Sequence, residues 1–325
     1  MDNSLEVKNS LKSFFRNILR NKGFLVIFLF IVLIAAIFIP NFLRGDNFVN
    51  ILSQAAIPMI TCLGMTFVLM TGGIDLSMGY SVGFSSYIFG YCAVQLGVPV
   101  GISVVIAMLV GGLWGLVNGL LVKLAKIPAF IVTLGTGYVI YGAAQIISNG
   151  QAIDKLPKEV LALGRTQILG LPATVYFALA VVIVCYIIVH RSTFGRSLSA
   201  VGYNPEAVRL SGINTNRLII SVYVLSGLLT GLAASLMSIR VNQAYPVMGG
   251  TTYTFEAITA AILGGASLNG GVGSAIGSVF GVLTMFVITN CLGLLGVNKY
   301  VYQAVLSIVI LIAIIFENLK NRRMQ

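Results

Sequence analysis

Residues 99–122 read PVGISVVIAMLVGGLWGLVNGLLV and contain no charged side chain. A helix needs about 20 apolar residues to cross the ~30 Å hydrocarbon core of a bilayer. Because a backbone in lipid must satisfy its own hydrogen bonds, an uninterrupted apolar run of this length predicts a membrane-spanning helix. Of the 325 residues in the chain, 58% are hydrophobic and 9% are charged, whereas soluble domains have roughly 25% charged residues. The sequence therefore predicts an all-α, polytopic membrane protein.

Ten apolar runs divide the chain, and we expect about ten transmembrane spans. The first run is too long for the apolar region of a typical signal peptide, and no small-residue cleavage site follows it, so we interpret it as a retained span. The expected transmembrane domain covers residues 23–318, between a basic N-terminal segment, 1–22, and a short tail, 319–325. The runs lie at 24–42, 50–71, 78–96, 99–122, 127–148, 171–189, 217–239, 255–268, 272–292 and 300–317.

The distribution of charge predicts the orientation of the chain. A formal net charge of +11 suggests nucleic acid at first sight, but the basic residues sort by loop, which argues against a nucleic-acid partner. If the N-terminus is cytoplasmic, fourteen of the twenty Lys and Arg residues fall in cytoplasmic segments. The positive-inside rule therefore places both termini in the cytoplasm. The polar loop 149–170 then lies outside, where it either meets a partner or serves as a solvated connector.

The stretch 70–83, MTGGIDLSMGYSVG, interrupts the apolar pattern, and Asp75 is its only charged residue. A carboxylate in a membrane segment costs at least ~2.5 kcal/mol, so such acids face a water-filled cavity or a partner and usually mark a pathway. Gly72 and Gly73 break the helix and permit close backbone approach. Alternatively, Asp75 or Ser77 caps the next helix. The two interpretations are compatible, because a capping residue can also line a cavity.

A short helix is encoded between two spans, within the predicted cytoplasmic loop 190–217. Asn204 is a favourable N-cap, Pro205 suits the first helical position, and Glu206 is favourable in the first turn. Gly212 then ends the helix. A helix of about two turns is marginal alone in water. It is therefore expected either to dock into a groove on another protein or to lie on anionic lipid headgroups.

The sequence contains no recognisable motif for nucleotide binding, catalysis or metal binding. It lacks the G-x-x-x-x-G-K-[ST] phosphate loop. The apolar runs contain no Ser/His pair and no paired carboxylates. The four cysteines are far apart, without metal-ligand spacing: Cys62, Cys92, Cys185 and Cys291. We therefore expect no catalytic residue, no metal site and no cofactor, and a chain that is not an enzyme.

Several motifs resemble a known family. The spacing of Glu206, Ala207 and Gly212 resembles the cytoplasmic loop of ABC importer permeases, through which the permease engages its ATPase. An ordered set of segments resembles the ribose-type sugar permeases within that superfamily: GGIDLSMG (72–79), GLVNGLLV with IPAFIVTLGT (115–136), GRSLSAVGYNPEAVRLSGI (195–213) and YTFEAITAAILGGASLNGGVGSAIG (253–277). Where that family often has two acids, this chain has Thr254 and Glu256, so no role of the first acid is carried over.

The resemblance implies the permease subunit of an ATP-driven importer in the bacterial cytoplasmic (inner) membrane, carrying a monosaccharide such as ribose or galactose. The implied partners are an ABC ATP-binding subunit, an extracytoplasmic sugar-binding protein, a second permease copy and membrane lipid. The implied ATPase-coupling helix comprises Asn204, Pro205, Glu206, Ala207, Arg209 and Gly212. Alternative solutes are a nucleoside or a furanone-type signal. A stand-alone secondary transporter is disfavoured, because it would leave this helix unexplained.

Neutral hydroxyl and amide side chains inside the apolar runs suit a sugar, which needs hydrogen bonds but no counter-ion. Such side chains also form ordinary hydrogen bonds between membrane helices, so both interpretations stay open for each of them. Thr136 and Gln145 belong to this class. The candidate translocation path comprises Asp75, Ser77, Gly72, Gly73, Ser53, Gln54, Asn118 and Thr133.

Glycine patterns give two further expectations. Gly111, Gly112, Gly115 and Gly119 predict close helix packing, with no direct role in binding a solute. TGGIDLSMG at 71–79 is echoed by LGGASLNGG at 263–271. Transporters are often built from internal repeats, but a glycine-rich membrane chain can also produce such an echo by chance.

Overall fold

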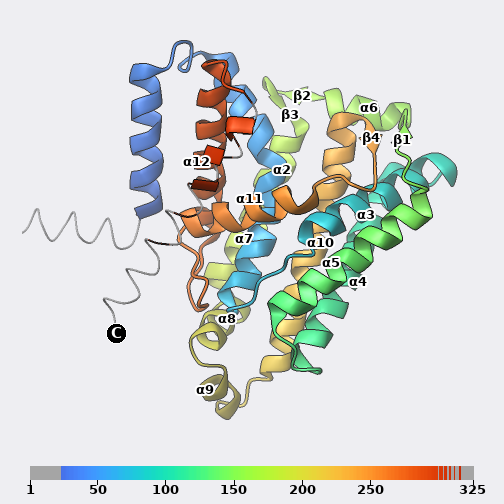
Figure 1. Ribbon diagram of the computed structural model, residues 1–325, viewed down its shortest axis with the longest axis vertical. Helices are drawn as coiled ribbons and strands as arrows, with labels where there is room; N and C mark the ends of the chain where they lie inside the picture. Colours follow the sequence, from blue (N-terminus) through green and yellow to red (C-terminus); the bar gives the residue numbers. More distant parts are fainter. Residues whose placement is uncertain are drawn as a thin grey trace, which may run out of the picture.

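The computed structural model describes residues 23–298 and, beyond them, 300–302, 304–305, 307–308, 311 and 315. Helices dominate this part of the chain (Figure 1), which confirms the all-α prediction. The helices are Gly23–Phe38, α2 (Gly45–Met70), α3 (Met78–Gly90), the π-helix η1 (Tyr91–Gln95), α4 (Val100–Lys123), α5 (Ala129–Ser148), α6 (Lys158–Arg165), α7 (Ala173–Arg191), α8 (Thr193–Tyr203), α9 (Pro205–Leu210), α10 (Thr215–Val241), α11 (Gly250–Leu263) and α12 (Ala275–Leu294).

Six of these helices are long and apolar enough to cross a membrane: α2, α4, α5, α7, α10 and α12. Two predicted runs form shorter helices instead. Run 78–96 folds into the 13-residue α3 followed by η1, and run 255–268 corresponds to the 14-residue α11. The predicted end of run 255–268 is wrong. Helix α11 ends earlier, at Leu263, because the chain turns at Gly264 and Gly265, and Gly265 has φ +89°. Half of run 300–317 lies outside the described residues.

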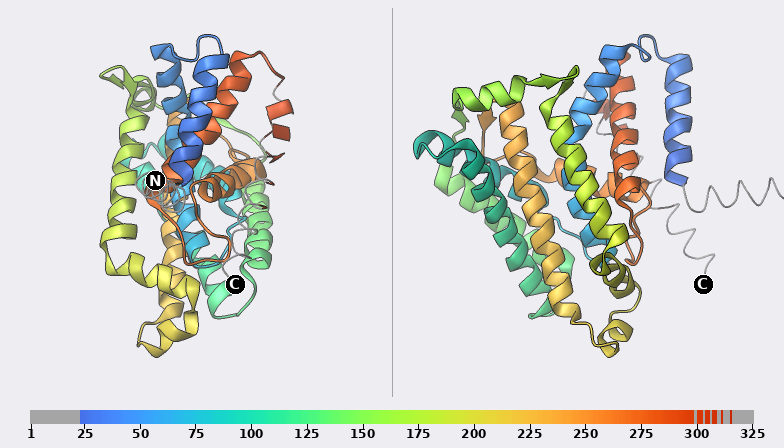
Figure 2. Two further views of the ribbon diagram at one scale, coloured as in Figure 1. Left: turned by 90° about the vertical axis from the view of Figure 1, so that its left-hand side faces the viewer. Right: turned by 180° about the vertical axis from the view of Figure 1, so that it is seen from behind.

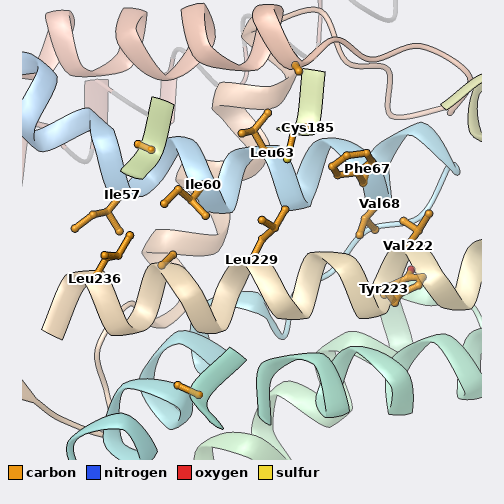
Figure 3. Packing of buried hydrophobic residues seen from close by; sticks show 14 of the residues in the cluster. Ile57, Ile60, Leu63, Phe67, Val68, Cys185, Val222, Tyr223, Leu229 and Leu236 are labelled. Atoms are coloured by element: carbon orange, nitrogen blue, oxygen red, sulfur yellow. The ribbon is translucent and has the colours of Figure 1, made fainter. Parts of the chain in front are cut away.

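Helices α2 and α10 form the centre of the bundle. Figure 3 shows them side by side and antiparallel, with Ile57 opposite Leu236 and Val68 near Val222. The most apolar stretch of α2 is 78% buried and that of α10 is 67% buried, whereas the corresponding stretches of α4 and α7 are 28% buried. Because an apolar surface is tolerated in lipid, the outer helices keep large exposed hydrophobic side chains, whereas α2 and α10 are enclosed by protein.

Glycines bring α4 and α10 into backbone contact. A Cβ atom at Gly111 would stand 2.3 Å from the Gly227 carbonyl oxygen, and one at Gly115 would stand 2.1 Å from the Tyr223 carbonyl oxygen. Small residues let membrane helices approach closely enough for van der Waals packing and backbone contacts. The close packing predicted from the glycines of run 99–122 is therefore confirmed, with α10 as the partner helix.

The connections between helices gather at two opposite ends of the bundle (Figures 1 and 2). We name them the α9 end (residues 71–77, 192–214 and 264–274) and the β end (residues 149–172 and 242–249). The β end carries two antiparallel two-residue pairings, β1 (Ile153–Asp154) with β4 (Gln243–Ala244) and β2 (Gln167–Ile168) with β3 (Leu171–Pro172). Among the long helices, α2, α4 and α7 run from the β end toward the α9 end, whereas α5, α10 and α12 run in the opposite direction.

Candidate functional site

The loop after α2, residues 71–77, buries the one acidic residue of the 70–83 stretch. Gly72 has φ +76°, a conformation that glycine adopts without steric cost. A Cβ atom at Gly73 would stand 2.6 Å from the Tyr223 hydroxyl oxygen, so the loop runs directly against α10. Asp75 is only 4% exposed as a result.

A chain of hydrogen bonds satisfies the buried Asp75 carboxylate. Its Oδ1 accepts hydrogen bonds from the Ser77 backbone N–H at 3.0 Å and the Ser77 hydroxyl at 2.6 Å. The Asn118 amide of α4 donates to the Ser77 hydroxyl oxygen at 2.8 Å, and the Thr136 hydroxyl of α5 donates to Asn118 Oδ1 at 2.6 Å. Buried polar groups require such partners. Since Ser77 makes no side-chain cap of its own, Asp75 is the residue that holds the start of α3.

Thr133 ties α5 to the same loop. Its hydroxyl lies 3.1 Å from the carbonyl oxygen of Ile74 and 2.8 Å from that of Ala129. The structure thus gathers six of the eight candidate path residues in one place: Gly72, Gly73, Asp75, Ser77, Asn118 and Thr133.

Ser53 and Gln54 lie elsewhere, toward the β end of α2. The carbonyl oxygen of Ser53 accepts a hydrogen bond from Arg240 Nη1 at 3.0 Å, and the Gln54 amide donates to Asn50 Oδ1 at 2.9 Å. At 1.5 Å per residue, about 24 Å of helix separates Gln54 from Met70 at the other end of α2. The structure does not bring these two residues to the Asp75 loop.

The helix predicted from Asn204 is present as α9. Asn204 Oδ1 accepts hydrogen bonds from the backbone N–H groups of Glu206 and Ala207 at 3.1 and 3.0 Å, and Pro205 is the first helical residue. Gly212 has φ +85° beyond the C-terminus. The predicted cap and terminator of this helix are confirmed.

Helix α9 protrudes from the bundle with an exposed face (Figure 1). Val208 is 7% exposed and packs inward, whereas Leu210 is 77% exposed. Arg209 and Glu206 form an exposed ion pair, with Nη2–Oε1 at 2.5 Å and Nε–Oε2 at 3.1 Å. The hydrogen bond from Arg209 holds the pKa of the Glu206 carboxyl below its usual range. Helix α9 therefore exposes one large apolar side chain beside a charged pair.

The residues directly before α9 meet two other parts of the α9 end. A Cβ atom at Gly202 would stand 2.0 Å from the Met70 carbonyl oxygen and 2.1 Å from the Gly271 nitrogen. The Gly271 N–H donates to the Met70 carbonyl at 2.9 Å, and Tyr203 covers Gly271. We call Met70, Gly202, Tyr203 and Gly271 the Gly202 junction. Sequence reasoning missed Gly202; the only signal for it was its place two residues before the α9 cap, Asn204.

The two echoed glycine segments lie next to each other at this junction. A Cβ atom at Gly72 would stand 3.5 Å from the Asn269 carbonyl oxygen. One segment links α2 to α3 and the other links α11 to α12. The echoed segments therefore occupy comparable positions between two helices.

The short helices α3 and α11 also touch through their backbones. The Gly79 N–H donates to the Thr254 hydroxyl oxygen at 2.8 Å, and Gly79 packs directly against Gly250. Thr254 stands where the resembling family often has its first acid, and here it satisfies a backbone donor of α3. Across the described part of the chain, no group of three or more His, Cys, Asp or Glu side chains could hold a metal ion.

Comparison with known proteins identifies the family. Residues 47–314 match the model described as branched-chain amino acid transport system / permease component. The chain belongs to this family. It is 36% identical over 293 residues to the ribose import permease protein RbsC of Bacillus subtilis, which covers 90% of both chains. It is 34% identical over 301 residues to the L-arabinose transport system permease protein AraH of Escherichia coli, covering 92% of this chain and 91% of AraH.

The galactose/methyl galactoside import permease protein MglC of Escherichia coli is 29% identical over 333 residues, covering 96% of this chain and 98% of MglC. These relatives confirm the resemblance to ribose-type sugar permeases. No solved structure matches the chain. Family membership and the six long apolar helices together establish a multi-pass membrane protein that is a transport permease component, not a catalytic subunit.

Proposed function

We propose that this chain is the membrane-spanning subunit of an ATP-driven importer for a simple sugar such as ribose, arabinose or galactose. The observation that carries the proposal is that permeases named for these sugars match the chain over nine-tenths of its length or more. The matches run through the Asp75 loop and α9, the two features for which the sequence motifs were most specific. The solute is one that needs hydrogen bonds rather than a counter-ion.

The energy source is a separate ABC ATP-binding subunit that docks on α9. Support comes from the exposed Leu210 beside the Glu206–Arg209 pair and from the lack of a phosphate loop in the sequence. The coupling residues are Asn204, Pro205, Glu206, Ala207, Arg209 and Gly212. Two permease copies form the translocating unit, and an extracytoplasmic sugar-binding protein delivers the solute to the β end.

The protein sits in the bacterial cytoplasmic (inner) membrane with about ten spans and both termini in the cytoplasm. The α9 end faces the cytoplasm and the β end faces outward. The basic residues support this orientation, since the segments expected in the cytoplasm, 1–22, 123–126, 190–217 and 319–325, carry fourteen of the twenty Lys and Arg residues. The helix Gly23–Phe38, α3 and α11 complete the set of spans together with run 300–317.

Movement of α9 reaches the translocation path through the Gly202 junction. Because Gly202 abuts both Met70 and Gly271, a shift of α8 and α9 displaces the ends of α2 and of the loop 264–274 together. The Asp75 loop begins directly after Met70. Asp75, Ser77, Asn118 and Thr133 then form the cytoplasmic part of the path, and Ser53 and Gln54 belong to its outer part.

The experiment that tests this function is uptake of radiolabelled sugar. Cells lacking their own ribose, arabinose and galactose importers are given this permease with its ATP-binding and solute-binding partners. Uptake of one of the three sugars, abolished when the ATP-binding subunit carries an inactivated phosphate loop, supports the proposal. Transport of none of the three, with the complex present in the membrane, would contradict it.

A further inference from the structure

Three tyrosines form a continuous aromatic surface where α3 and α5 meet. The ring centroid of Tyr80 lies 5.6 Å from that of Tyr138 and 5.7 Å from that of Tyr141. Tyr80 is half-buried, whereas Tyr141 is 37% exposed and Tyr138 is 59% exposed. We name these three side chains the tyrosine platform. Helix α5, which carries two of them, lies on the side of the bundle that faces the viewer in Figure 1.

Short-range features of the sequence build the platform. Tyr138 and Tyr141 are three residues apart, and positions at this spacing are neighbours on the surface of a helix. A Cβ atom at Gly137 would stand 2.9 Å from Tyr80 Cδ2, so the glycine lets the Tyr80 ring lie across α5. The Gln145 amide donates a hydrogen bond to the Tyr141 hydroxyl oxygen at 3.1 Å. The proton of the Tyr141 hydroxyl is therefore free to be donated to a ligand.

The depth of Tyr138 argues that the platform does not face lipid. Tyrosine normally anchors a span at the membrane–water interfaces, where its hydroxyl reaches water. Tyr176 and Tyr186 fit this rule, because they lie toward the two ends of α7. Tyr138 is the tenth of the 20 residues of α5, in the middle of the span. Polar groups at this depth usually face the bundle interior or a water-filled cavity, so the exposed face of α5 borders a water-filled route.

The platform is continuous with the Asp75 network. Tyr80 follows Ser77 by three residues, and the Ser77 hydroxyl donates to the Asp75 carboxylate. Thr133 of α5 contacts the same loop through the carbonyl oxygen of residue 74. About 7.5 Å of helix separates Thr133 from Tyr138, in the direction of the β end. A solute that moves along α5 from the β end therefore meets the platform first and the Asp75 loop next.

The chemistry of the platform fits a sugar. The face of an aromatic ring carries partial negative charge. The C–H groups of a sugar ring are polarised by the neighbouring oxygens and pack favourably on that face. A phenol hydroxyl both donates and accepts hydrogen bonds, so it pairs with sugar hydroxyl groups. An alkyl chain of a lipid would cover the rings but leave the hydroxyls at mid-depth without partners.

We propose that the tyrosine platform is a sugar-contacting surface on the translocation route, where the sugar ring stacks on Tyr138 and accepts a hydrogen bond from the Tyr141 hydroxyl. This inference rests on the proposed import function. It adds a contact surface at mid-depth, nearer the β end than the Asp75 loop. It also makes aromatic stacking, in addition to hydrogen bonding, a source of sugar recognition in the membrane.

The transport test uses the whole complex in proteoliposomes, with ribose, L-arabinose and galactose as probes. Tyr138→Leu removes the aromatic face and is expected to lower uptake of the carried sugar by about tenfold, whereas Tyr138→Phe keeps the face and is expected to stay within about twofold of wild type. Tyr141→Phe removes the donated hydrogen bond and is expected to lower uptake by about threefold. Phe177→Leu is the matched control, since Phe177 is 51% exposed on α7, on the opposite side of the bundle from α5 (Figure 2), and its uptake is expected to be unchanged.

A labelling experiment reads out the platform without relying on transport rates. Leu134→Cys places a thiol one helical turn before Tyr138 on the same face and leaves the platform intact. This thiol is expected to react with a water-soluble methanethiosulfonate, and saturating sugar is expected to slow the reaction several-fold. Adding Tyr138→Leu is expected to remove that protection. Val184→Cys, 55% exposed on α7, is expected to stay unlabelled because it faces lipid, and the parent chain with its four native cysteines sets the background.

The outcomes separate the platform from the proposed function. If the wild type carries one of the sugars but Tyr138→Leu carries it equally well, the platform assignment is overturned while the function stands. A Leu134→Cys thiol that reacts equally fast with and without sugar overturns it too. So does an unreactive thiol, because lipid or the second copy then covers this face. If the wild type carries none of the three sugars, the proposed function fails and this inference fails with it.

Discussion

A methyl group added at Gly202 would collide with backbone atoms of two neighbouring segments. The Cβ atom of Gly202→Ala would stand 2.0 Å from the Met70 carbonyl oxygen and 2.1 Å from the Gly271 nitrogen, whereas ordinary contacts begin at 3.4 Å. Neither neighbour is a flexible side chain that could swing aside. The α8 helix must therefore move away from α2 and the loop 264–274 by about 1 Å.

The size of the effect follows from two opposing contributions. Inserting a methyl group into a packed site costs typically 1–3 kcal/mol, and contacts with backbone favour the upper end, about 3 kcal/mol. Replacing Gly by Ala inside a helix gains about 1 kcal/mol of helix propensity. We therefore expect Gly202→Ala to lower the free energy of unfolding by about 2 kcal/mol and to weaken the transmission of movement from α9 to α2.

The assay uses the reconstituted complex and separates two properties: how much sugar is imported per ATP hydrolysed, and whether the ATP-binding subunit still binds the permease. ATP hydrolysis, sugar uptake and co-purification of the ATP-binding subunit are measured together with Tm. We expect the subunit to stay bound, because the exposed face of α9 is untouched, while the number of sugar molecules imported per ATP falls about tenfold. Gly142→Ala is the control, since a Cβ atom there meets nothing within 4 Å. A variant Gly202→Ala with wild-type Tm and wild-type sugar-to-ATP ratio would refute the role of the Gly202 junction.

Four further changes test other parts of the account. Asp75→Asn keeps the acceptor oxygen that holds Ser77 but removes the charge, so uptake per permease molecule should fall while membrane level holds; equal losses on immunoblots would indicate a purely structural cap. Asn204→Ala removes the cap of α9, worth about 1 kcal/mol, and should weaken ATP-binding-subunit affinity about fivefold in a pull-down; unchanged affinity counts against a preformed α9. Glu206→Arg should abolish that co-purification without affecting membrane insertion, and normal co-purification with normal transport removes the docking assignment. Gly227→Val places a side chain against the Gly111 carbonyl and should lower stability by about 3 kcal/mol, seen as a lower Tm; no change would contradict the α4–α10 packing.

Local signals in the sequence were sufficient for part of this structure. Apolar length identified the long helices, because lipid forces every backbone group into helical hydrogen bonds. Asn204, Pro205 and Gly212 specified α9, since caps and terminators act over a few residues. The glycines of run 99–122 predicted a close helix contact, but they did not identify α10 as the partner helix.

Features that depend on distant segments could not be read from the sequence. Run 78–96 looks like an ordinary span, yet it divides into α3 and the π-helix η1. Run 255–268 is short in the sequence, but its turn at Gly264 and Gly265 and its packing against α3 became visible only in the structure. Gly202 resembles any other helical glycine until Met70 and Gly271 are brought beside it.

The sequence could predict only part of how the candidate path residues are grouped. Gly72, Gly73, Asp75 and Ser77 share a loop, so their proximity was predictable, whereas Asn118 and Thr133 join them only through tertiary packing. Composition alone could not separate Ser53 and Gln54 from this group, because position along α2 decides which end of the bundle they reach.

The central claim is that this chain forms the transport path but does not hydrolyse ATP itself. A separate ATP-hydrolysing subunit moves it through α9. The most direct measurement is sugar uptake into proteoliposomes that contain the purified chain alone or the chain with its ATP-binding subunit, with solute-binding protein and ATP supplied in both. We predict ATP-dependent accumulation only when the subunit is present. Accumulation of sugar against its gradient by the chain alone would contradict the claim.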